Sequence, residues 1–141
     1  MTYRPASFPV SVKAVIVRRG KVLLLRNERD EWELPGGKLE LGEDPPERLR
    51  QEIVEECGWE AKVGPILDAW QYHIRDGIDV LIVTYGAEVT ADDPPVLSHE
   101  HKQVGLFAEH EVANLRMPDG YKRSIADWYA RLRLPAEQAA R

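Results

Sequence analysis

The segment from Asp44 to Gly58 constrains the fold most, because it carries both a start signal and a stop signal for an α-helix. Asp44 can cap the helix, and two prolines follow where the first helical residues need no N–H donor. Glu47 stands three residues after Asp44, as in a capping box. Gly58 supplies a left-handed residue that ends the helix after Cys57. The apolar residues recur every four positions, and they predict a buried stripe of Leu49, Ile53 and Cys57.

Three glutamates lie on this helix beside the apolar stripe. At about 100° per residue, Glu56 lies about 40° from Glu52 on one side, and Glu55 lies about 60° away on the other. Their mutual repulsion, the helix dipole in the last turn and partial burial all make this arrangement unfavourable. A hard divalent cation such as Mg²⁺, which takes oxygen ligands, removes the problem. The pattern indicates a metal site, and the alternative is an acidic helix face that is simply solvated.

The rest of the chain contains mostly apolar, β-branched runs bounded by turn residues. We expect strands over residues 10–18, 21–26, 32–34, 66–75, 78–89 and 104–108. The Asp76-Gly77 pair is a strong hairpin signal between two of them. Residues 35–37, Pro-Gly-Gly, are expected to end the third strand, because the chain there needs unusual backbone angles.

Two further helices are expected after the last strand. One is short and lies near Glu109 to Leu115, and Asp119 is expected to cap the other. The order of elements predicts an α/β fold in which a mixed sheet has helices on both faces. The length fits a single domain over residues 1–141, with residues 135–141 as a frayed tail.

Charge, cysteine content and hydropathy limit the partners and the cellular location that we expect for this chain. The net charge of −5 disfavours binding to a nucleic-acid polymer, although a small phosphate compound could bind through metal ions. Cys57 is the one cysteine, so no internal disulfide can form, and its helical spacing indicates a core residue. No apolar run approaches the roughly 18 residues that span a bilayer, and the start lacks the pattern of a signal peptide. We therefore expect a soluble, cytoplasmic protein with no membrane partner.

From Gly37 to Trp59 the chain reads GKLELGEDPPERLRQEIVEECGW. This stretch resembles the Nudix box, G-x5-E-x7-R-E-U-x-E-E-x-G-U, in which U is a bulky apolar residue. The positions that match are Gly37, Glu43, Glu52, Ile53, Glu55, Glu56, Gly58 and Trp59. One specified position departs, because Gln51 stands where the family has arginine. The preceding residues 32–37, WELPGG, are also similar to the usual approach to the box.

The resemblance implies a Nudix-type α/β/α sandwich around a mixed sheet, and a metal-dependent hydrolysis of diphosphate bonds. It implies that Glu52 and Glu56 are the chief ligands of Mg²⁺, for which Mn²⁺ can substitute. It also implies that Glu55 assists and that the Gly37 carbonyl contributes. The short chain most resembles the MutT-like branch, whose members act on nucleoside triphosphates. The implied partner is a small nucleotide-type substrate, and a homodimer stays open, because family members often pair.

The general base has two candidates under this resemblance. One is Glu52, and the other is an acid from a loop late in the chain, for which Glu100 is our candidate. The neighbouring His99 and His101 are expected to be surface residues, because no third histidine lies close by in the sequence to complete a zinc site.

Gln51 and Glu43 belong to the predicted support of the box, together with Gly58. The family arginine holds box carboxylates, including the residue that corresponds to Glu43, by ion pairs. Glutamine cannot replace such a charge-assisted contact. Arg48, one turn before Glu52, is expected to compensate in part. We therefore expect reduced activity without loss of function.

Residues that would bind the rest of the substrate are weakly indicated. Arg26 could meet a phosphate, and Trp32 and Tyr72 could stack on a base, although most strand aromatics belong to the core. The leading hypothesis is an active hydrolase of the diphosphate bond of a nucleoside di- or triphosphate or of a related nucleoside diphosphate. The alternative, favoured by Gln51, is a Nudix-fold nucleotide-binding or sensor module with weak or no catalysis.

Overall fold

The computed structural model describes residue 3 and residues 5–134, so the predicted tail at 135–141 lies outside the described residues. Its strands are β1 (Val10–Arg18), β2 (Lys21–Arg26), β3 (Trp32–Glu33), β4 (Gly36–Lys38), β5 (Lys62–Arg75), β6 (Ile78–Glu88) and β7 (Gln103–Ala108). Its helices are α1 (Pro45–Cys57), α2 (Glu109–Val112) and α3 (Asp119–Leu132). Across this part of the chain, no helix is long and apolar enough to cross a membrane.

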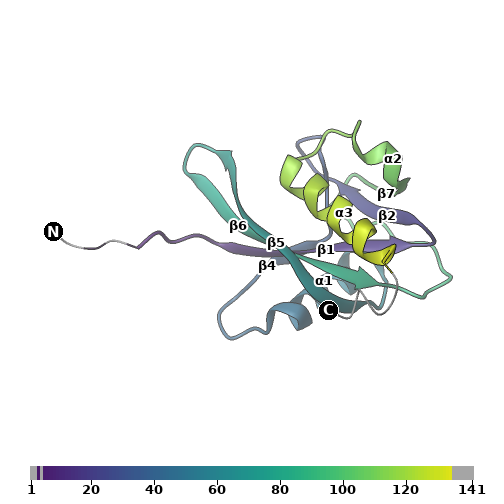
Figure 1. Cartoon of the computed structure of the whole chain (residues 1–141). Helices are drawn as coiled ribbons and strands as arrows, with labels where there is room; N and C mark the ends of the chain where they lie inside the picture. Colours follow the sequence, from purple (N-terminus) through teal and green to yellow (C-terminus); the bar gives the residue numbers. More distant parts are fainter. Residues whose placement is uncertain (1–2, 4, 135–141) are drawn as a thin grey trace.

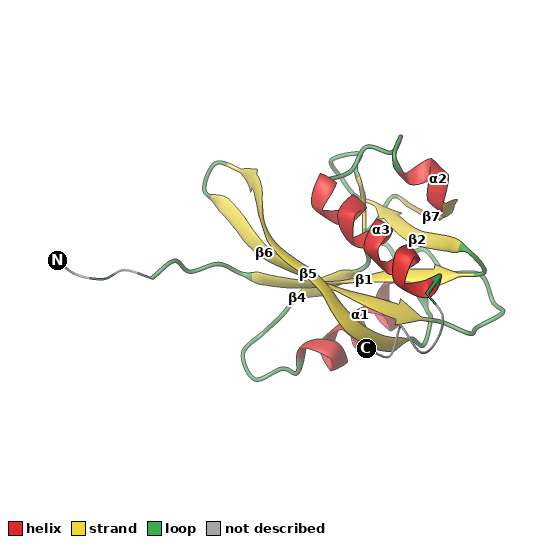
Figure 2. Cartoon of the chain, viewed as in Figure 1, coloured by secondary structure: helices red, strands yellow, loops and turns green. Residues whose placement is uncertain are grey.

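The strands form one mixed sheet, in the order β3-β2-β1-β6-β5. β1 runs parallel to β6 and antiparallel to β2 and β4, and β7 pairs with β2. Helices α1 and α3 lie on opposite sides of this sheet (Figure 1 and Figure 2). The predicted sandwich, an α/β fold with helices on both faces of a mixed sheet, is confirmed.

Alternating residues of β1 connect the two layers of the core. Val12, Ala14 and Ile16 belong to the apolar cluster that includes the α1 stripe. Val15 belongs to the second cluster, in which Ile125 and other α3 residues pack on the other face. Because successive strand side chains point to opposite faces, this one strand anchors both helices.

The predicted ends of α1 are confirmed. The Asp44 carboxylate accepts a hydrogen bond from the Glu47 backbone N–H at 3.2 Å, and prolines occupy the first two helical positions. Gly58 has φ +75° and donates its N–H to the Val54 carbonyl at 2.9 Å. The stripe of Leu49, Ile53 and Cys57 is fully buried. Local signals therefore determine where this helix begins and ends.

The expectation that residues 35–37 are only a strand end was wrong in part. The third strand does end at Glu33, but Gly36–Lys38 forms the further strand β4, which pairs with β1. Gly36 has φ +151°, and a Cβ there would lie 1.9 Å from the Val12 carbonyl oxygen. Glycine thus permits an approach of two backbones that a side chain would block.

Other boundaries also differ from the prediction. β5 begins at Lys62, four residues early, because a register irregularity between Val63 and Ile66 accommodates the proline there. The short helix α2 ends at Val112, three residues early. Asp119 is the first residue of α3 and not its cap, because Pro118 occupies the cap position in an extended conformation.

Candidate metal site on helix α1

The three glutamates of α1 are not equally buried. Glu56 is 3% exposed and Glu52 is 9% exposed, whereas Glu55 is exposed. The difference follows from helix geometry, because Glu56 is nearest the apolar stripe, Glu52 is next and Glu55 is turned farthest from it. The structure therefore brings two of the three predicted carboxylates into the protein and leaves the third at its edge.

The backbone of β4 lies directly against these two carboxylates. The Gly36 N–H donates to Glu56 Oε1 at 2.9 Å. A Cβ at Gly37 would lie 2.5 Å from the Glu52 carboxyl carbon, closer than real side chains allow. The two glycines therefore let peptide groups reach the acids, and the role of the Gly37 carbonyl as a metal ligand stays a prediction.

Arg48 holds the outer carboxylates of the site. Its guanidinium contacts Glu52 Oε1, and its Nη1 lies 3.5 Å from Glu43 Oε2. The same Nη1 donates to the Gln51 side-chain oxygen at 3.4 Å. In the family, an arginine at the position of Gln51 is expected to hold the box carboxylates. In this chain Arg48 contacts two of them, Glu43 and Glu52. Whether these contacts compensate for Gln51 in catalysis stays a prediction.

Sequence reasoning did not single out Lys13 or Glu33. Lys13 is 9% exposed, and its Nζ donates to the Leu34 carbonyl at 3.2 Å. Burial disfavours the ammonium, but Tyr121 and the nearby glutamates outweigh it and raise the pKa of Lys13. A lysine inside the otherwise apolar run of β1 was the sequence signal that could have identified it.

The prediction that His101 is a surface residue was wrong. Its side chain is 10% exposed, with Nε2 2.9 Å from Glu33 Oε1 and Nδ1 3.6 Å from Glu56 Oε2. His99 is exposed, as expected. The error arose because Glu33 and Glu56 are 68 and 45 residues away in the chain, and only the fold brings them to His101.

These charges shift one another's pKa values. Burial disfavours the Glu33 carboxylate, but Lys13 and hydrogen bonds from His101 and Asn27 outweigh it and lower the pKa of Glu33 to about 2. Burial dominates at Glu56, and it raises the pKa of that carboxyl to about 7. The hydrogen bond to Glu33 raises the pKa of His101 against the opposing effect of burial. Ionised Glu56 is thus the unfavourable charge in this group.

The donors suit a hard divalent cation without forming a complete set of ligands. Across residues 5–134, no three acidic, histidine or cysteine side chains converge as metal ligands. Glu52 and Glu56 could supply two carboxylates, beside the peptide backbone at Gly37. Mg²⁺ uses one or two carboxylates and fills its other positions with water and phosphate oxygens. The residues present therefore fit such a cation bound together with a phosphate compound.

The other predicted site residues lie outside this carboxylate group. Glu100 is exposed, and within the described chain no hydrogen bond or ion pair joins its carboxylate to α1. Arg26 lies 3.6 Å from Asp30 in an ion pair. Trp32 packs edge to face on Phe107, with ring centroids 4.8 Å apart. Tyr72 lies among the apolar side chains of the α3 face. Their roles in binding substrate or in catalysis stay predictions.

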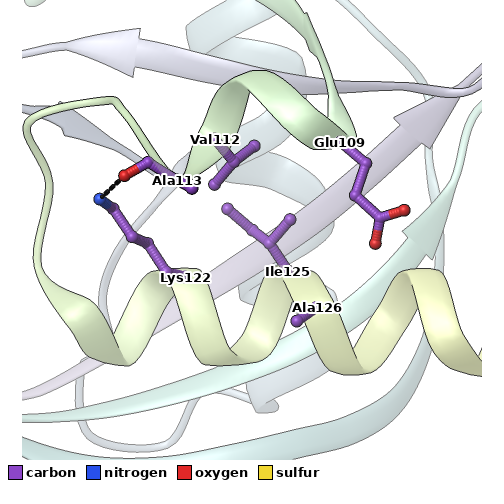
Figure 3. Close-up of a pocket in the computed structure, with 6 residues that line it drawn as sticks. All are labelled: Glu109, Val112, Ala113, Lys122, Ile125 and Ala126. Carbon is purple, nitrogen blue, oxygen red and sulfur yellow. Dashed lines mark hydrogen bonds between the residues drawn. The ribbon is translucent and has the colours of Figure 1, made fainter.

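A separate cavity of about 200 Å³ lies between α2 and α3 (Figure 3). It is lined by Glu109, Val112, Ala113, Lys122, Ile125 and Ala126. The Lys122 ammonium donates a hydrogen bond to the Ala113 carbonyl at 2.9 Å, so it has a partner within the protein. The cavity shares no residue with the carboxylates of α1, and it does not mark the candidate site.

Comparison with known proteins agrees with the geometry. The family model described as NUDIX domain matches residues 7–129. A "MutT-like protein" of Streptomyces ambofaciens is 34% identical over 100 residues, which are 67% of this chain and 64% of that protein. The "CTP pyrophosphohydrolase" of Escherichia coli strain K12 is 33% identical over 106 residues, covering 72% of this chain and 76% of that protein.

A solved structure supports the same relationship. The solution structure of the E. coli ORF135 protein has a TM-score of 0.70 and 26% identity, and the match covers 92% of this chain and 94% of that one. The first curated relatives are longer than the matched regions, which span 30%, 64% and 33% of their lengths. The likeness therefore concerns a domain that these relatives share.

Proposed function

The chain belongs to the Nudix family, and from that premise we propose that it hydrolyses a diphosphate bond with a divalent cation held by Glu52 and Glu56. The proposed substrate is a nucleoside di- or triphosphate, or a nucleoside diphosphate linked to another group. One observation carries the proposal: two buried carboxylates lie against a glycine backbone on one helix. Buried charges without a cation between them would be unfavourable.

The substrate class is supported by the names of the relatives. CTP and other nucleoside triphosphates contain the diphosphate linkage that the proposed chemistry needs, and CTP is the compound in the name of the E. coli relative. The carboxylates of Glu52 and Glu56 would repel such an anion, and a divalent cation between them and the phosphates removes that repulsion.

Each residue of the site has a distinct role in the proposed reaction. When bound, Mg²⁺ or Mn²⁺ supplies the positive charge that neutralises the diphosphate and polarises the attacked P–O bond. Arg48 keeps Glu52 in place, and the Gly36 N–H keeps Glu56 in place. Glu55, at the edge of the site, assists in binding the cation. Water attacks one phosphorus, and the other phosphate leaves with its substituent.

The proton of the attacking water passes to a general base. We propose Glu52 for this role, and Glu100 is the second candidate, as a loop acid that could approach when substrate binds. Glu52 is favoured because its carboxylate is already at the site, whereas Glu100 is exposed. A Glu100→Gln variant that keeps full turnover would leave Glu52 as the base.

The decisive experiment measures release of phosphate or pyrophosphate from a panel of substrates. The panel contains nucleoside triphosphates, nucleotide sugars, ADP-ribose and dinucleoside polyphosphates, each with Mg²⁺, with Mn²⁺ and with EDTA. We expect turnover of at least one nucleoside triphosphate that depends on the metal. Turnover that EDTA leaves unchanged would contradict the role of the cation. Size-exclusion chromatography of the same sample tests for a homodimer through its elution volume.

The second candidate function is a nucleotide-binding module without useful catalysis. Gln51 favours it, because the family arginine is absent. The contacts of Arg48 with Glu43 and Glu52 argue against it. Calorimetry with Mg²⁺ and each nucleotide separates the two functions: binding without turnover would select the module.

A further inference from the structure

The imidazole of His101 lies between two carboxylates that come from different parts of the fold. Nε2 is 2.9 Å from Glu33 Oε1, at the end of β3, and Nδ1 is 3.6 Å from Glu56 Oε2, on α1. The side chains of His101, Glu33 and Glu56 are 10%, 16% and 4% exposed. Little solvent therefore reaches the ring, and the two acids determine its orientation.

The backbone on either side of His101 is held in place. The His101 N–H donates to the Ser98 carbonyl at 3.3 Å, and the Lys102 N–H donates to the Arg26 carbonyl at 2.9 Å. The Lys102 ammonium also pairs with Asp30 at 2.9 Å. The contact of Lys102 with Arg26 continues the pairing of β2 with β7, and the contact with Ser98 closes a turn, so the histidine enters the site from a fixed position.

Glu33 is held as firmly as the histidine that it contacts. Its second carboxylate oxygen accepts from the Asn27 side-chain amide at 3.1 Å. The Asn27 side-chain oxygen in turn accepts from the backbone N–H groups of Arg29 and Glu31. A chain of hydrogen bonds thus runs from the β2–β3 loop through Glu33 to Nε2 of His101.

The second ring nitrogen has no equivalent partner. Nδ1 is buried and lacks a hydrogen bond to any described residue, yet Glu56 Oε2 lies 3.6 Å away. A buried polar atom without a partner is unfavourable, and a carboxylate oxygen can only accept. Because Nε2 donates its N–H to Glu33, an N–H at Nδ1 belongs to the imidazolium form of His101. That N–H would attract Glu56 Oε2 while the Gly36 N–H holds Oε1.

We propose that His101 is a positioning residue, which Glu33 orients so that its Nδ1 fixes the Glu56 carboxylate for binding the cation. The inference rests on the proposed function of Glu56, and it adds a role for a loop histidine that acts through that carboxylate. Groups that orient a metal-binding side chain typically contribute 10- to 100-fold to metal affinity or activity.

The test measures Mn²⁺ affinity of the full chain by EPR of the free ion, and the nucleotide turnover of the same samples. His101→Ala should weaken Mn²⁺ binding about 10- to 100-fold. His101→Asn places an amide near the position of Nδ1 and should recover part of this affinity. His101→Gln places its amide near Nε2, keeps the contact with Glu33, and should bind Mn²⁺ as weakly as the alanine variant.

His99→Gln is the matched control, because His99 is exposed in the same loop. It should bind Mn²⁺ and turn over substrate as the wild type does. Asparagine and glutamine variants keep a polar side chain at position 101, and they carry the test if the alanine variant does not fold. If glutamine restores affinity and asparagine does not, His101 only ties the loop to Glu33 and the proposal is wrong.

Two further outcomes separate the positioning role of His101 from the proposed hydrolysis. Wild-type protein that binds Mn²⁺ and hydrolyses a nucleotide, beside a His101→Ala variant with the same Mn²⁺ affinity, would overturn the positioning role alone. Wild-type protein that binds no Mn²⁺ with or without nucleotide would overturn both.

Discussion

On α1, the apolar stripe that contains Ile53 lies beside the face that carries Glu52 and Glu56, and both surfaces turn toward the sheet. Burying an isoleucine or leucine side chain stabilises a fold by about 1.5–3 kcal/mol. Burying a carboxylate is unfavourable, as the raised pKa of Glu56 reflects. The apolar stripe therefore offsets the unfavourable burial of charges that the fold itself does not need. Changes on the two faces should therefore have opposite consequences.

The largest expected effect is on catalysis. Glu52→Gln and Glu56→Gln should each lower metal-dependent hydrolysis about 10³-fold or more, because a bound cation contributes several kcal/mol to the transition state. Steady-state turnover at saturating Mg²⁺ measures the loss. Glu55→Gln, on the exposed edge of the same helix, is the control and should lose less than about tenfold. Equal losses in all three variants would remove the distinction between the buried pair and Glu55.

The apolar face should instead control stability. Ile53 is fully buried between α1 and the sheet, so Ile53→Ala should lower the free energy of unfolding by about 2–5 kcal/mol. Urea denaturation followed by circular dichroism measures the change. At a temperature where the variant remains folded, the Mn²⁺ affinity per folded molecule should change little. A variant that kept its stability would show that the stripe is not what holds the helix to the sheet.

The third effect depends on pH. Replacing the buried acid Glu56 should raise the free energy of unfolding, whereas replacing Ile53 should lower it. The pKa of Glu56 is raised from 4.5 to about 7 in the folded chain, so its stabilising contribution is present below 4.5 and is lost as the pH rises through about 7. In EDTA, Glu56→Gln should therefore unfold with a free energy about 1–3 kcal/mol above that of the wild type at pH of about 8. Near pH 4.5 the two proteins should differ little. Urea titrations at both pH values measure this, and a pH-independent difference would contradict it.

The smallest effect concerns the arginine that holds the carboxylates. Arg48→Gln should lower turnover about tenfold, because its guanidinium contacts Glu52 and Glu43. Gln51→Arg restores the family residue, yet it should change turnover less than about threefold, because those contacts already exist. The same kinetic assay compares both variants with the double variant, in which the arginine introduced at position 51 should recover part of the loss. A large gain from Gln51→Arg alone would show that Arg48 does not compensate.

Much of the site could be predicted because its signals are local. The caps of α1 depend on Asp44 and Gly58, a few residues from the helix they limit, and the predicted ends are those observed. The spacing of Glu52 and Glu56 places both on one face of any helix formed there. The mixed sheet followed in the same way from the order of apolar runs. By contrast, β4 was missed, because its pairing with β1 depends on a distant strand and on the absence of a Cβ at Gly36.

Periodicity and capping act over one or two turns, so the order of residues was enough to predict an acidic helix beside a mixed sheet. The Nudix type of that helix came from the resemblance of residues 37–59 to the box. The positions of His101 and Lys13 around Glu56, and the exposure of Glu55, depend instead on how the chain folds. These groups meet because strands far apart in the chain pair and pack under α1. No local pattern encodes such a meeting, since the energy of a buried charge depends on neighbours that the fold assembles.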